Sequence, residues 1–243
     1  MQEQFLRIQM LFGESAMAAL QNSHVAVFGL GGVGSYAVEA LVRSGVGELT
    51  LVDNDAVSVS NLNRQLEALH STVGQSKAEA MAARCRDINP GVILHPICGR
   101  YEAASREEFF GAHYDYVIDA IDTVSSKLDL IATALARDIP IVSALGTGNK
   151  TDPSQLRLTD LSQTYNCPLA RVVRRELKAR GITHLRVLFS PEKALTPAPL
   201  EAPPPGRRSV PGSLAWVPGC GGLMLGGDVV MDLIRRAKEV SSC

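Results

Sequence analysis

A glycine-rich turn between a short strand and a helix constrains this chain more than any other feature. His24–Phe28 is a compact apolar run that predicts a buried strand, and residues 32–44 follow with helical spacing of apolar side chains. The turn between them matches the pattern GxGxxG, with glycines at Gly29, Gly31, Gly32 and Gly34. Such glycines permit a tight turn and let backbone N–H groups approach a phosphate at the start of the helix. The turn therefore predicts a Rossmann-like nucleotide site.

Strand and helix patterns alternate over residues 24–145. Further strands are predicted at 49–53, 92–97, 116–119 and 139–143, and helices at 14–22, 74–88 and 125–137. This order is typical of an α/β fold with a doubly wound, mostly parallel sheet and helices on both faces.

The pattern changes after Gly146, which predicts a C-terminal strand-and-helix extension. Its predicted strands are 156–159, 185–189 and 214–217, and its predicted helices are 168–180 and 220–236. Residues 191–211 contain seven of the 13 prolines, so we expect an extended, flexible loop there. We interpret residues 1–243 as a single domain, with a nucleotide-binding core at about 24–150 and a C-terminal part at 151–243.

Composition excludes several classes of protein. Hydrophobic residues make up 46% and charged residues 20% of the chain, which is typical of a globular core and unlike a disordered tail. We find neither a signal-peptide pattern nor an apolar run of roughly 20 residues, so we expect a cytoplasmic protein without a membrane span. The five cysteines form no CxxC pair, so we expect neither a disulfide scaffold nor zinc.

Charged residues after the glycine turn narrow the choice of nucleotide. Asp53 ends the second predicted strand, 24 residues after Gly29, where a carboxylate can accept both ribose hydroxyls. These features alone leave NAD, FAD and ATP open. Arg64 and Lys77 follow, and could neutralise the β- and γ-phosphates of a triphosphate, whereas an NAD site needs no added cations. Either residue alone would more often be a surface cation, but their place after Asp53 favours ATP.

Two aspartates close the fourth predicted strand, at the sheet edge where ligands bind in doubly wound folds. Asp122 could ligate Mg²⁺ that bridges the phosphates, or it could cap the next helix. Asp119 could instead hold the loop by hydrogen bonds.

Basic residues gather in the C-terminal half. Residues 165–210 hold nine basic and three acidic side chains, which permits a polyanionic partner and equally permits a solvated helix face. The candidates for nucleic-acid contacts are four cations at helical spacing and two in the proline-rich loop: Arg171, Arg174, Arg175, Lys178, Arg207 and Arg208. Aromatic residues are only 5% of the chain, so we expect no aromatic platform for base stacking.

The motifs GLGGVG, NLNRQ, VGQSK and DAID, in this order, resemble those of the ubiquitin-activating-enzyme-like adenylyltransferases over about residues 5–150. That resemblance implies adenylation with ATP and Mg²⁺, in which a carboxylate attacks the α-phosphate and pyrophosphate leaves. It also implies a homodimer in which Arg7 enters the partner subunit's site, although Gln4 stands where a second early arginine is common. The implied ligand contacts are Asp53 on the ribose, Asn61, Arg64 and Lys77 on the phosphates, and Asp122 on the metal.

The remaining motifs indicate the branch of this superfamily. Its carrier-protein-activating members usually keep two CxxC pairs for zinc, which this chain lacks. Many also use a cysteine to hold the carrier protein as a thioester after adenylation. Only Cys167 and Cys220 are candidates for that cysteine in the C-terminal part. Three stretches instead resemble the tRNA threonylcarbamoyladenosine dehydratases: RIQMLFGESAM, TDLSQTYNCPLARVVRRELKARGI and GCGGLMLGGDVV.

That second resemblance implies ATP-dependent dehydration of threonylcarbamoyladenosine next to the tRNA anticodon. The carbamoyl group attacks the activated carboxylate carbon and forms a ring, and AMP leaves. No enzyme cysteine is required. The main alternative is an adenylyltransferase that activates the C-terminus of a ubiquitin-like sulfur-carrier protein. A non-catalytic scaffold and an NAD-dependent dehydrogenase are weaker alternatives, and a sulfur-relay partner stays open.

Overall fold

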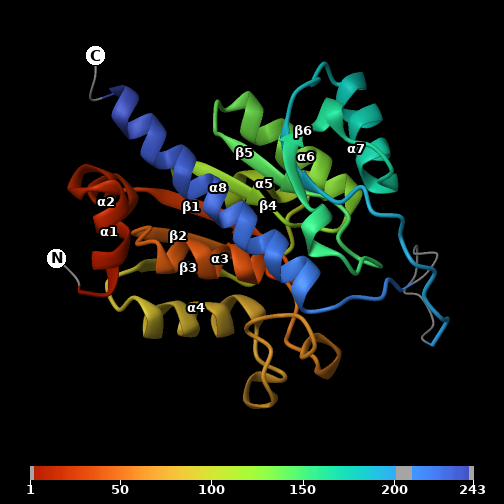
Figure 1. Cartoon of the computed structure of the whole chain (residues 1–243), viewed down its shortest axis with the longest axis horizontal. Coiled ribbons are helices and arrows are strands. Elements are labelled where there is room, and N and C mark those ends of the chain that lie inside the picture. Colours follow the sequence, from red (N-terminus) through yellow and green to blue (C-terminus); the bar gives the residue numbers. More distant parts are fainter. Residues whose placement is uncertain (1–2, 201–209, 241–243) are drawn as a thin grey trace.

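The computed structural model describes residues 3–200 and 210–240 of the chain. One seven-stranded sheet in the order β3-β2-β1-β4-β5-β7-β6 runs through the molecule (Figure 1). The strands are β1 (His24–Phe28), β2 (Glu48–Val52), β3 (Ile93–Ile97), β4 (Tyr116–Asp119), β5 (Ile141–Ala144), β6 (Arg157–Asp160) and β7 (Arg186–Phe189). Every residue of β1, β4 and β5 is buried, which is why these strands are mostly apolar.

The strand order creates a crevice at the carboxyl ends of the strands. The chain runs outward from β1 to β2 and β3, and then returns to place β4 on the other side of β1. All pairs from β3 to β7 are parallel, and β6 is antiparallel to β7. The carboxyl ends of β1 and β4 therefore flank a topological switch point, where α/β folds bind ligands. The predicted doubly wound α/β fold with a C-terminal extension is confirmed.

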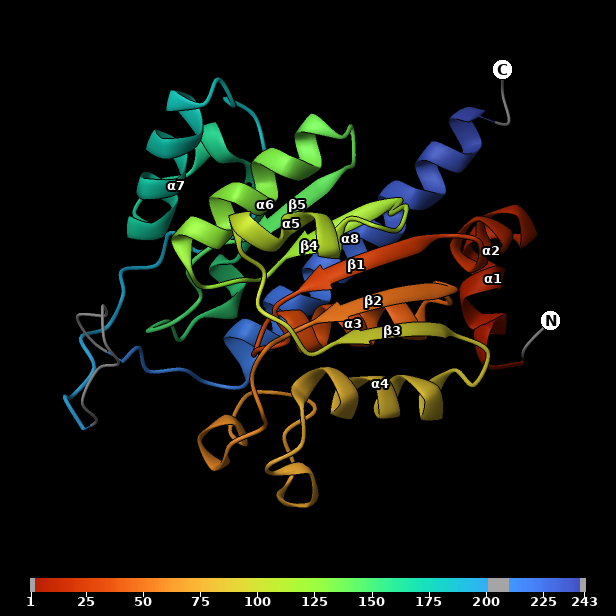
Figure 2. The ribbon, with the colours of Figure 1, turned by 180° about the vertical axis from the view of Figure 1, so that it is seen from behind.

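Helices cover both faces of the sheet (Figures 1 and 2). One face carries α2 (Glu14–Gln21), α3 (Gly34–Arg43), α4 (Lys77–Ile88) and α8 (Trp216–Val240), with α1 (Leu6–Phe12) packed on α2. The other face carries α5 (Arg106–Phe109), α6 (Val124–Ala136) and α7 (Pro168–Ala179). Short 3-10 turns lie at Glu3–Phe5, Val59–Asn61, His70–Thr72, Ala103–Ser105, Pro153–Gln155 and Leu161–Gln163.

Glycines let α8 cross α3 at close range. A side chain at Gly222 would place its Cβ 2.2 Å from the Val33 carbonyl oxygen, and one at Gly226 would place it 2.5 Å from Ala40 Cβ. By length and composition α8 could cross a membrane, but 61% of its apolar stretch is buried against the rest of the protein. The helix is apolar because its side chains complete the hydrophobic core.

The predicted strand at 214–217 is wrong, because α8 already begins at Trp216. Pro218 lies in the first turn of α8, where the amides have no helical partner and proline therefore costs little. The Gly219 amide donates to the Ala215 carbonyl oxygen at 3.0 Å, which starts the helical hydrogen-bonding before the predicted residue 220.

The described chain on both sides of residues 201–209 contacts one residue of the core. The Leu195 amide donates to the Asn149 carbonyl oxygen at 2.9 Å, and the Gly212 amide donates to Asn149 Oδ1 at 2.6 Å. Residues 201–209 lie outside the described residues. The chain thus leaves the core and returns to it at the same place, beside the strand ends.

Candidate nucleotide-binding site

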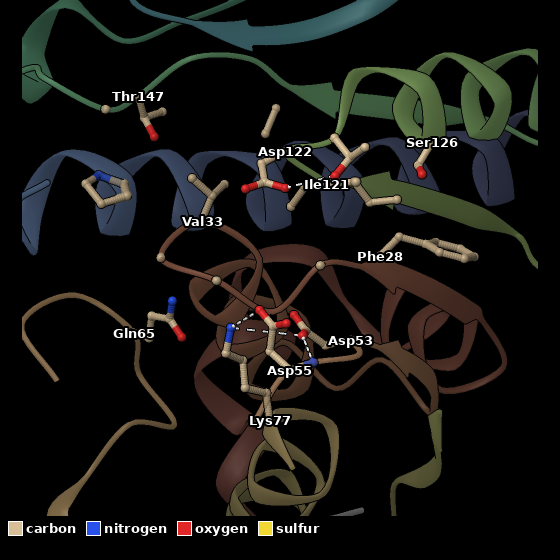
Figure 3. A pocket seen from close by; sticks show the side chains of 18 of the residues that line it. Phe28, Val33, Asp53, Asp55, Gln65, Lys77, Ile121, Asp122, Ser126 and Thr147 are labelled. Atoms are coloured by element: carbon tan, nitrogen blue, oxygen red, sulfur yellow. Dashed lines mark hydrogen bonds and ion pairs between the residues drawn. The ribbon is translucent and has the colours of Figure 1, made fainter. Parts of the chain in front are cut away.

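A cavity of about 670 Å³ opens at the carboxyl ends of β1, β2, β4 and β5. Its walls come from five separate stretches: the glycine turn after β1, residues 52–65 with Lys77, residues 99–101, residues 120–126, and residues 144–148. Pro211, Ser213 and Pro218 close a further side. Figure 3 shows Asp53, Asp55 and Lys77 on one side of this space and Asp122 on the other.

The glycine turn after β1 can be built only from glycine at two positions. Gly29 has a φ of +89°, and a Cβ there would lie 2.7 Å from the Ala120 carbonyl oxygen. A Cβ on Gly34 would lie 1.8 Å from the Gly29 carbonyl oxygen. The turn consequently folds against β4 and leaves the start of α3 bare toward the cavity. Unshielded amides at a helix start are suited to a phosphate.

Asp53 is fixed at the end of β2 by two backbone amides. The Leu30 amide donates to Asp53 Oδ2 at 2.7 Å, and the Asp55 amide donates to Oδ1 at 2.8 Å. Each carboxylate oxygen keeps lone-pair capacity for a further donor. This arrangement could accept the two hydroxyls of a ribose, as a carboxylate at this strand end does in related folds.

Lys77 begins α4 and holds a buried positive charge at the cavity wall. Its Nζ lies 2.9 Å from Asp55 Oδ2 and 4.0 Å from Asp53 Oδ1, and the residue is 5% exposed. The two carboxylates offset the cost of burying this ammonium. The three charged groups form the polar floor of the cavity (Figure 3).

Arg64 and Asn61 lie on the 3-10 turn and loop that follow β2. Arg64 Nη1 donates to the Ser60 carbonyl oxygen at 2.8 Å and to Asn63 Oδ1 at 2.9 Å. Asn61 is buried and its Oδ1 accepts from the Ser58 amide at 3.0 Å. Both line the cavity, so the structure brings them together with the glycine turn and Lys77. The remaining guanidinium donors could contact a phosphate.

The two aspartates after β4 take different positions. Asp119 is fully buried, and its Oδ1 accepts from the Ile121 amide at 3.1 Å, which confirms that it holds the loop. Asp122 is exposed and lines the cavity. The N-cap of α6 is Thr123, so Asp122 does not occupy the cap position. A carboxylate at this rim has the hard oxygen ligands that Mg²⁺ prefers.

Sequence reasoning missed a buried cation behind Asp119. Lys127 is fully buried on α6 and donates to Asp119 Oδ2 at 2.5 Å, to Ser143 Oγ at 3.2 Å and to the Ala144 carbonyl oxygen at 2.9 Å. The Ser143 hydroxyl donates to the same aspartate oxygen at 2.6 Å. The signal available in the sequence was a lone lysine on the apolar side of a helix.

Two further polar side chains beside the site were missed. Neither oxygen of Glu67 nor Oε1 of Gln65 has a hydrogen-bond partner among the described residues, and all three atoms are buried. Burial raises the pKa of Glu67 to about 7. Gln65 lines the cavity, but its unpaired oxygen is itself buried.

Other predicted site residues lie away from the cavity. Arg7 is exposed on α1, which lies at the opposite end of β1 from the glycine turn (Figure 2). Arg171, Arg175 and Lys178 are exposed on α7. Arg174 is half-buried, and its Nη1 donates to the Thr164 carbonyl oxygen at 2.7 Å and to Thr164 Oγ1 at 2.6 Å. Arg207 and Arg208 lie outside the described residues.

The comparisons with known proteins agree with this geometry. Residues 5–234 match the model of the ThiF family. The chain belongs to the ThiF family. A tRNA threonylcarbamoyladenosine dehydratase of Bacillus subtilis (strain 168) is 44% identical to this ThiF-family chain. The alignment is 244 positions long, gaps included, and covers 97% of the chain and 96% of that protein.

Solved structures of the E. coli tRNA N6-threonylcarbamoyladenosine dehydratase TcdA also match the ThiF-family chain. The complex with ATP superposes with a TM-score of 0.84 at 34% identity and covers 99% of this chain and 96% of that chain. The complex with AMP gives a TM-score of 0.87 at 35% identity, over 97% of this chain and 96% of that one. The resemblance to tRNA threonylcarbamoyladenosine dehydratases that the motifs indicated is confirmed.

The described cysteines of the ThiF-family chain are free thiols. Cys167 is buried at the N-cap of α7, where its Sγ accepts from the Ala170 amide at 3.5 Å. Burial raises the pKa of Cys85 to about 12, which makes that thiol a poor nucleophile. Cys220 is half-buried on α8. The structure therefore gives Cys167 a structural contact at the start of a helix.

Proposed function

We propose that this ThiF-family chain is an ATP-dependent tRNA threonylcarbamoyladenosine dehydratase. The observation that carries the proposal is the convergence of Lys77, Arg64 and Asp53 on one cavity beside a glycine turn that exposes helix amides. The extent of the match to the dehydratases, over nearly the whole length of both chains, supports the choice of substrate. We also propose that residues 1–243 act as a single adenylation domain.

The roles of the cavity residues follow from their chemistry. Asp53 binds the ribose hydroxyls, and the amides at the start of α3 and the side chains of Asn61, Arg64 and Lys77 bind the phosphates. Arg64 offers a planar fork of donors, and Lys77 a point charge. Both groups stabilise the negative charge that builds on the phosphates in the transition state.

The substrate carboxylate supplies the nucleophile. Its oxygen attacks the α-phosphorus of ATP, the bond to the β-phosphate oxygen breaks, and pyrophosphate leaves. The carbamoyl group then closes onto the activated carbon, and AMP leaves with the former carboxylate oxygen. The substrate thereby loses one water, and the chemistry requires no nucleophile from the chain.

Mg²⁺ fits the rim of the cavity, where Asp122 would hold it. The metal would neutralise phosphate charge when bound. Asp122 Oδ1 accepts a hydrogen bond from Thr123 Oγ1 at 3.4 Å, which orients the carboxylate.

The tRNA would lie along α7. Arg171, Arg175 and Lys178 are exposed there and would contact phosphates, which position an RNA without reading its sequence. Arg174 holds the turn before α7 through Thr164 and contributes to the same positive field. We propose that Arg207 and Arg208 extend this surface.

We propose a homodimer in which Arg7 completes the site of the partner subunit. Its support is that Arg7 cannot reach the cavity of its own subunit, because α1 lies at the opposite end of the sheet (Figure 2). The exposed side chains of Leu6, Met10 and Leu11 lie on the same helix and would be covered in such a dimer. We further propose that the protein acts in the cytoplasm, where tRNA and reduced thiols are found, and that a sulfur-relay protein is a partner.

The decisive experiment incubates purified protein with tRNA that carries threonylcarbamoyladenosine, together with ATP and Mg²⁺. We expect AMP to be released and mass spectrometry of the nucleosides to show loss of one water. Lys77→Ala and Arg64→Ala should abolish both products, whereas Arg86→Ala removes an exposed cation from the same helix as Lys77 and should leave them unchanged.

The same preparation tests the alternative function. A carrier-protein adenylyltransferase would exchange pyrophosphate into ATP when given a small protein that ends in Gly-Gly, and would not respond to tRNA. Such a result would contradict our proposal.

Mixing Arg7→Ala with Lys77→Ala tests the dimer. One site of the mixed dimer has both groups intact, so we expect part of the activity to return. No recovery would contradict the role of Arg7 across the interface.

A further inference from the structure

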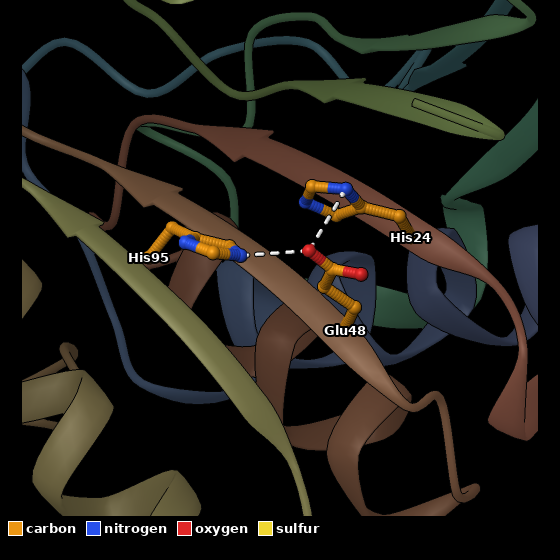
Figure 4. Close-up of side chains that lie close together, drawn as sticks. All are labelled: His24, Glu48 and His95. Carbon is orange, nitrogen blue, oxygen red and sulfur yellow. Dashed lines mark hydrogen bonds and ion pairs between the residues drawn. The ribbon is translucent and has the colours of Figure 1, made fainter. Parts of the chain in front are cut away.

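Three side chains, at the amino ends of β1 and β2 and in the middle of β3, form a cluster away from the nucleotide cavity. His24, Glu48 and His95 lie on one face of the sheet, and each offers one ligand atom within 4.8 Å of the others (Figure 4). His24 and Glu48 are direct register partners, and His95 is opposite Thr50, two residues further along β2. None of the three lines the cavity described above.

A chain of hydrogen bonds on the other side of His24 favours one tautomer of its ring. His24 Nε2 lies 2.8 Å from Thr50 Oγ1, Thr50 hydrogen-bonds to the Tyr114 hydroxyl, and Tyr114 donates to the Phe109 carbonyl oxygen at 2.6 Å. A carbonyl oxygen can only accept, so the donors run from Nε2 through Thr50 and Tyr114 to Phe109. His24 Nδ1 therefore has a lone pair that faces Glu48.

This geometry places two hydrogen-bond acceptors, the lone pair of His24 Nδ1 and the Glu48 Oε1 atom, close to each other. His24 Nδ1 lies 3.4 Å from Glu48 Oε1, and His95 Nε2 lies 2.7 Å from the same oxygen. Burial lowers the pKa of His24, against the opposing pull of Glu48. Other charges around it are Asp115, which accepts from the His24 amide at 2.8 Å, and His113, which pairs with Asp115.

We propose that His24, Glu48 and His95 form a binding site for a zinc ion or a similar divalent transition metal. Two imidazoles and a carboxylate, with water in the fourth position, are a known ligand set for zinc. Metal–ligand bonds of about 2.0–2.2 Å in a tetrahedron separate ligand atoms by about 3.4 Å. The Nδ1–Oε1 distance already has this value, and the contact between His95 and Glu48 must widen slightly.

The surroundings of the cluster suit a metal in two further ways. A ligating histidine usually donates its other ring N–H to an acceptor, which holds the ring in place, and Thr50 is that acceptor for His24. The His95 side chain is 47% exposed and that of Glu48 is 35% exposed, so an ion can enter from solvent. The site uses no cysteine, so the lack of CxxC pairs does not bear on it. A bound ion would cross-link three strands where β1 and β2 begin.

The test is zinc titration of the chelator-treated, full-length protein by isothermal calorimetry, without ATP. A Cys98→Ser, Cys243→Ser background removes two thiols that could take up zinc. We expect one ion per chain, and weaker binding by more than about tenfold in His95→Gln and Glu48→Gln. His184→Gln is the matched control, because His184 is an exposed histidine that pairs with Asp160 at 3.3 Å on another part of the surface.

Two further measurements distinguish a loss of zinc binding from a loss of folding in the variants. Thr50→Val leaves all three ligands in place, and we expect it to weaken binding by about tenfold through the loss of the support to His24. Zinc should also raise the melting temperature of the parent protein and of His184→Gln but not that of His95→Gln. Absence of binding by the parent protein, or equal binding by the parent and His95→Gln, would overturn the proposal.

Discussion

Lys127 Nζ lies 2.5 Å from Asp119 Oδ2, and neither side chain is exposed to solvent. The pair joins α6 to the end of β4, beside the residues that line the nucleotide cavity. Breaking it from one side would leave a charge buried without a partner. The pair therefore positions the loop that carries Asp122.

Lys127→Met should lower the free energy of unfolding by about 3–5 kcal/mol, because the Asp119 carboxylate loses its counter-charge in the core. Urea denaturation followed by circular dichroism measures this change. The double variant Lys127→Met, Asp119→Asn removes both charges and should recover part of the loss. Equal stability of the single variant and the parent would show that the pair contributes nothing.

Glu67 should make the stability of the protein fall as pH rises. Its pKa in the folded state is about 7, above the ordinary value of 4.5, so the folded state holds a proton that the unfolded state has released between these values. The contribution of Glu67 is complete below about pH 4.5 and is lost as pH approaches 7. The loss amounts to roughly 3 kcal/mol.

Glu67→Gln tests this dependence, since the amide cannot titrate. Denaturation midpoints measured from pH 5 to pH 8 should fall less steeply in Glu67→Gln than in the parent protein. Glu79→Gln, at an exposed position on α4, should follow the parent. Parallel curves for Glu67→Gln and the parent would contradict the burial effect.

Two glycines of α8 should respond oppositely to alanine. Gly222→Ala would place its Cβ 2.2 Å from the Val33 carbonyl oxygen, and we expect a loss of about 1–3 kcal/mol or more in the free energy of unfolding. Gly227→Ala meets no atom within 4 Å, and alanine gains about 0.5–1 kcal/mol in a helix. Chemical denaturation of both variants distinguishes close packing from intrinsic helix preference. A stabilising Gly222→Ala would show that α8 can move away from α3.

The double variant Arg171→Ala, Lys178→Ala should weaken tRNA binding. Each lost phosphate contact should lower the slope of log affinity against log salt by about one. Filter binding over a series of salt concentrations measures the slope. Arg86→Ala, Arg235→Ala removes two exposed cations on the opposite face of the sheet and should leave the slope unchanged. An equal drop in both variants would mean that only net charge matters.

Much of the nucleotide site could be predicted because its parts are local in the sequence. The glycine turn and Asp53 each follow a strand directly, Asp122 lies three residues beyond β4, and the carboxyl ends of parallel strands lie side by side. The predicted helix at 220–236 was also found, but its start was missed because proline is tolerated in a first helical turn and reads as a helix breaker in the sequence.

Contacts between distant segments were decided by the tertiary structure. Asn63 Nδ2 donates to the Ser213 carbonyl oxygen at 3.0 Å across 150 residues, and this contact closes one side of the cavity. The burial of Lys127 and Glu67 likewise depends on which elements pack around them. A charged residue in a helix or loop has the same sequence pattern whether it ends up in solvent or in the core.

The sequence by itself determined the order of strands and helices and the chemistry of the phosphate-binding turn, because backbone preferences and hydrophobic periodicity act over a few residues. Only the tertiary structure decided that Pro218 and Ser213 complete the cavity and that His24, Glu48 and His95 meet on one face. Those neighbours are set by strand order and helix packing, which bring together side chains that no local interaction relates.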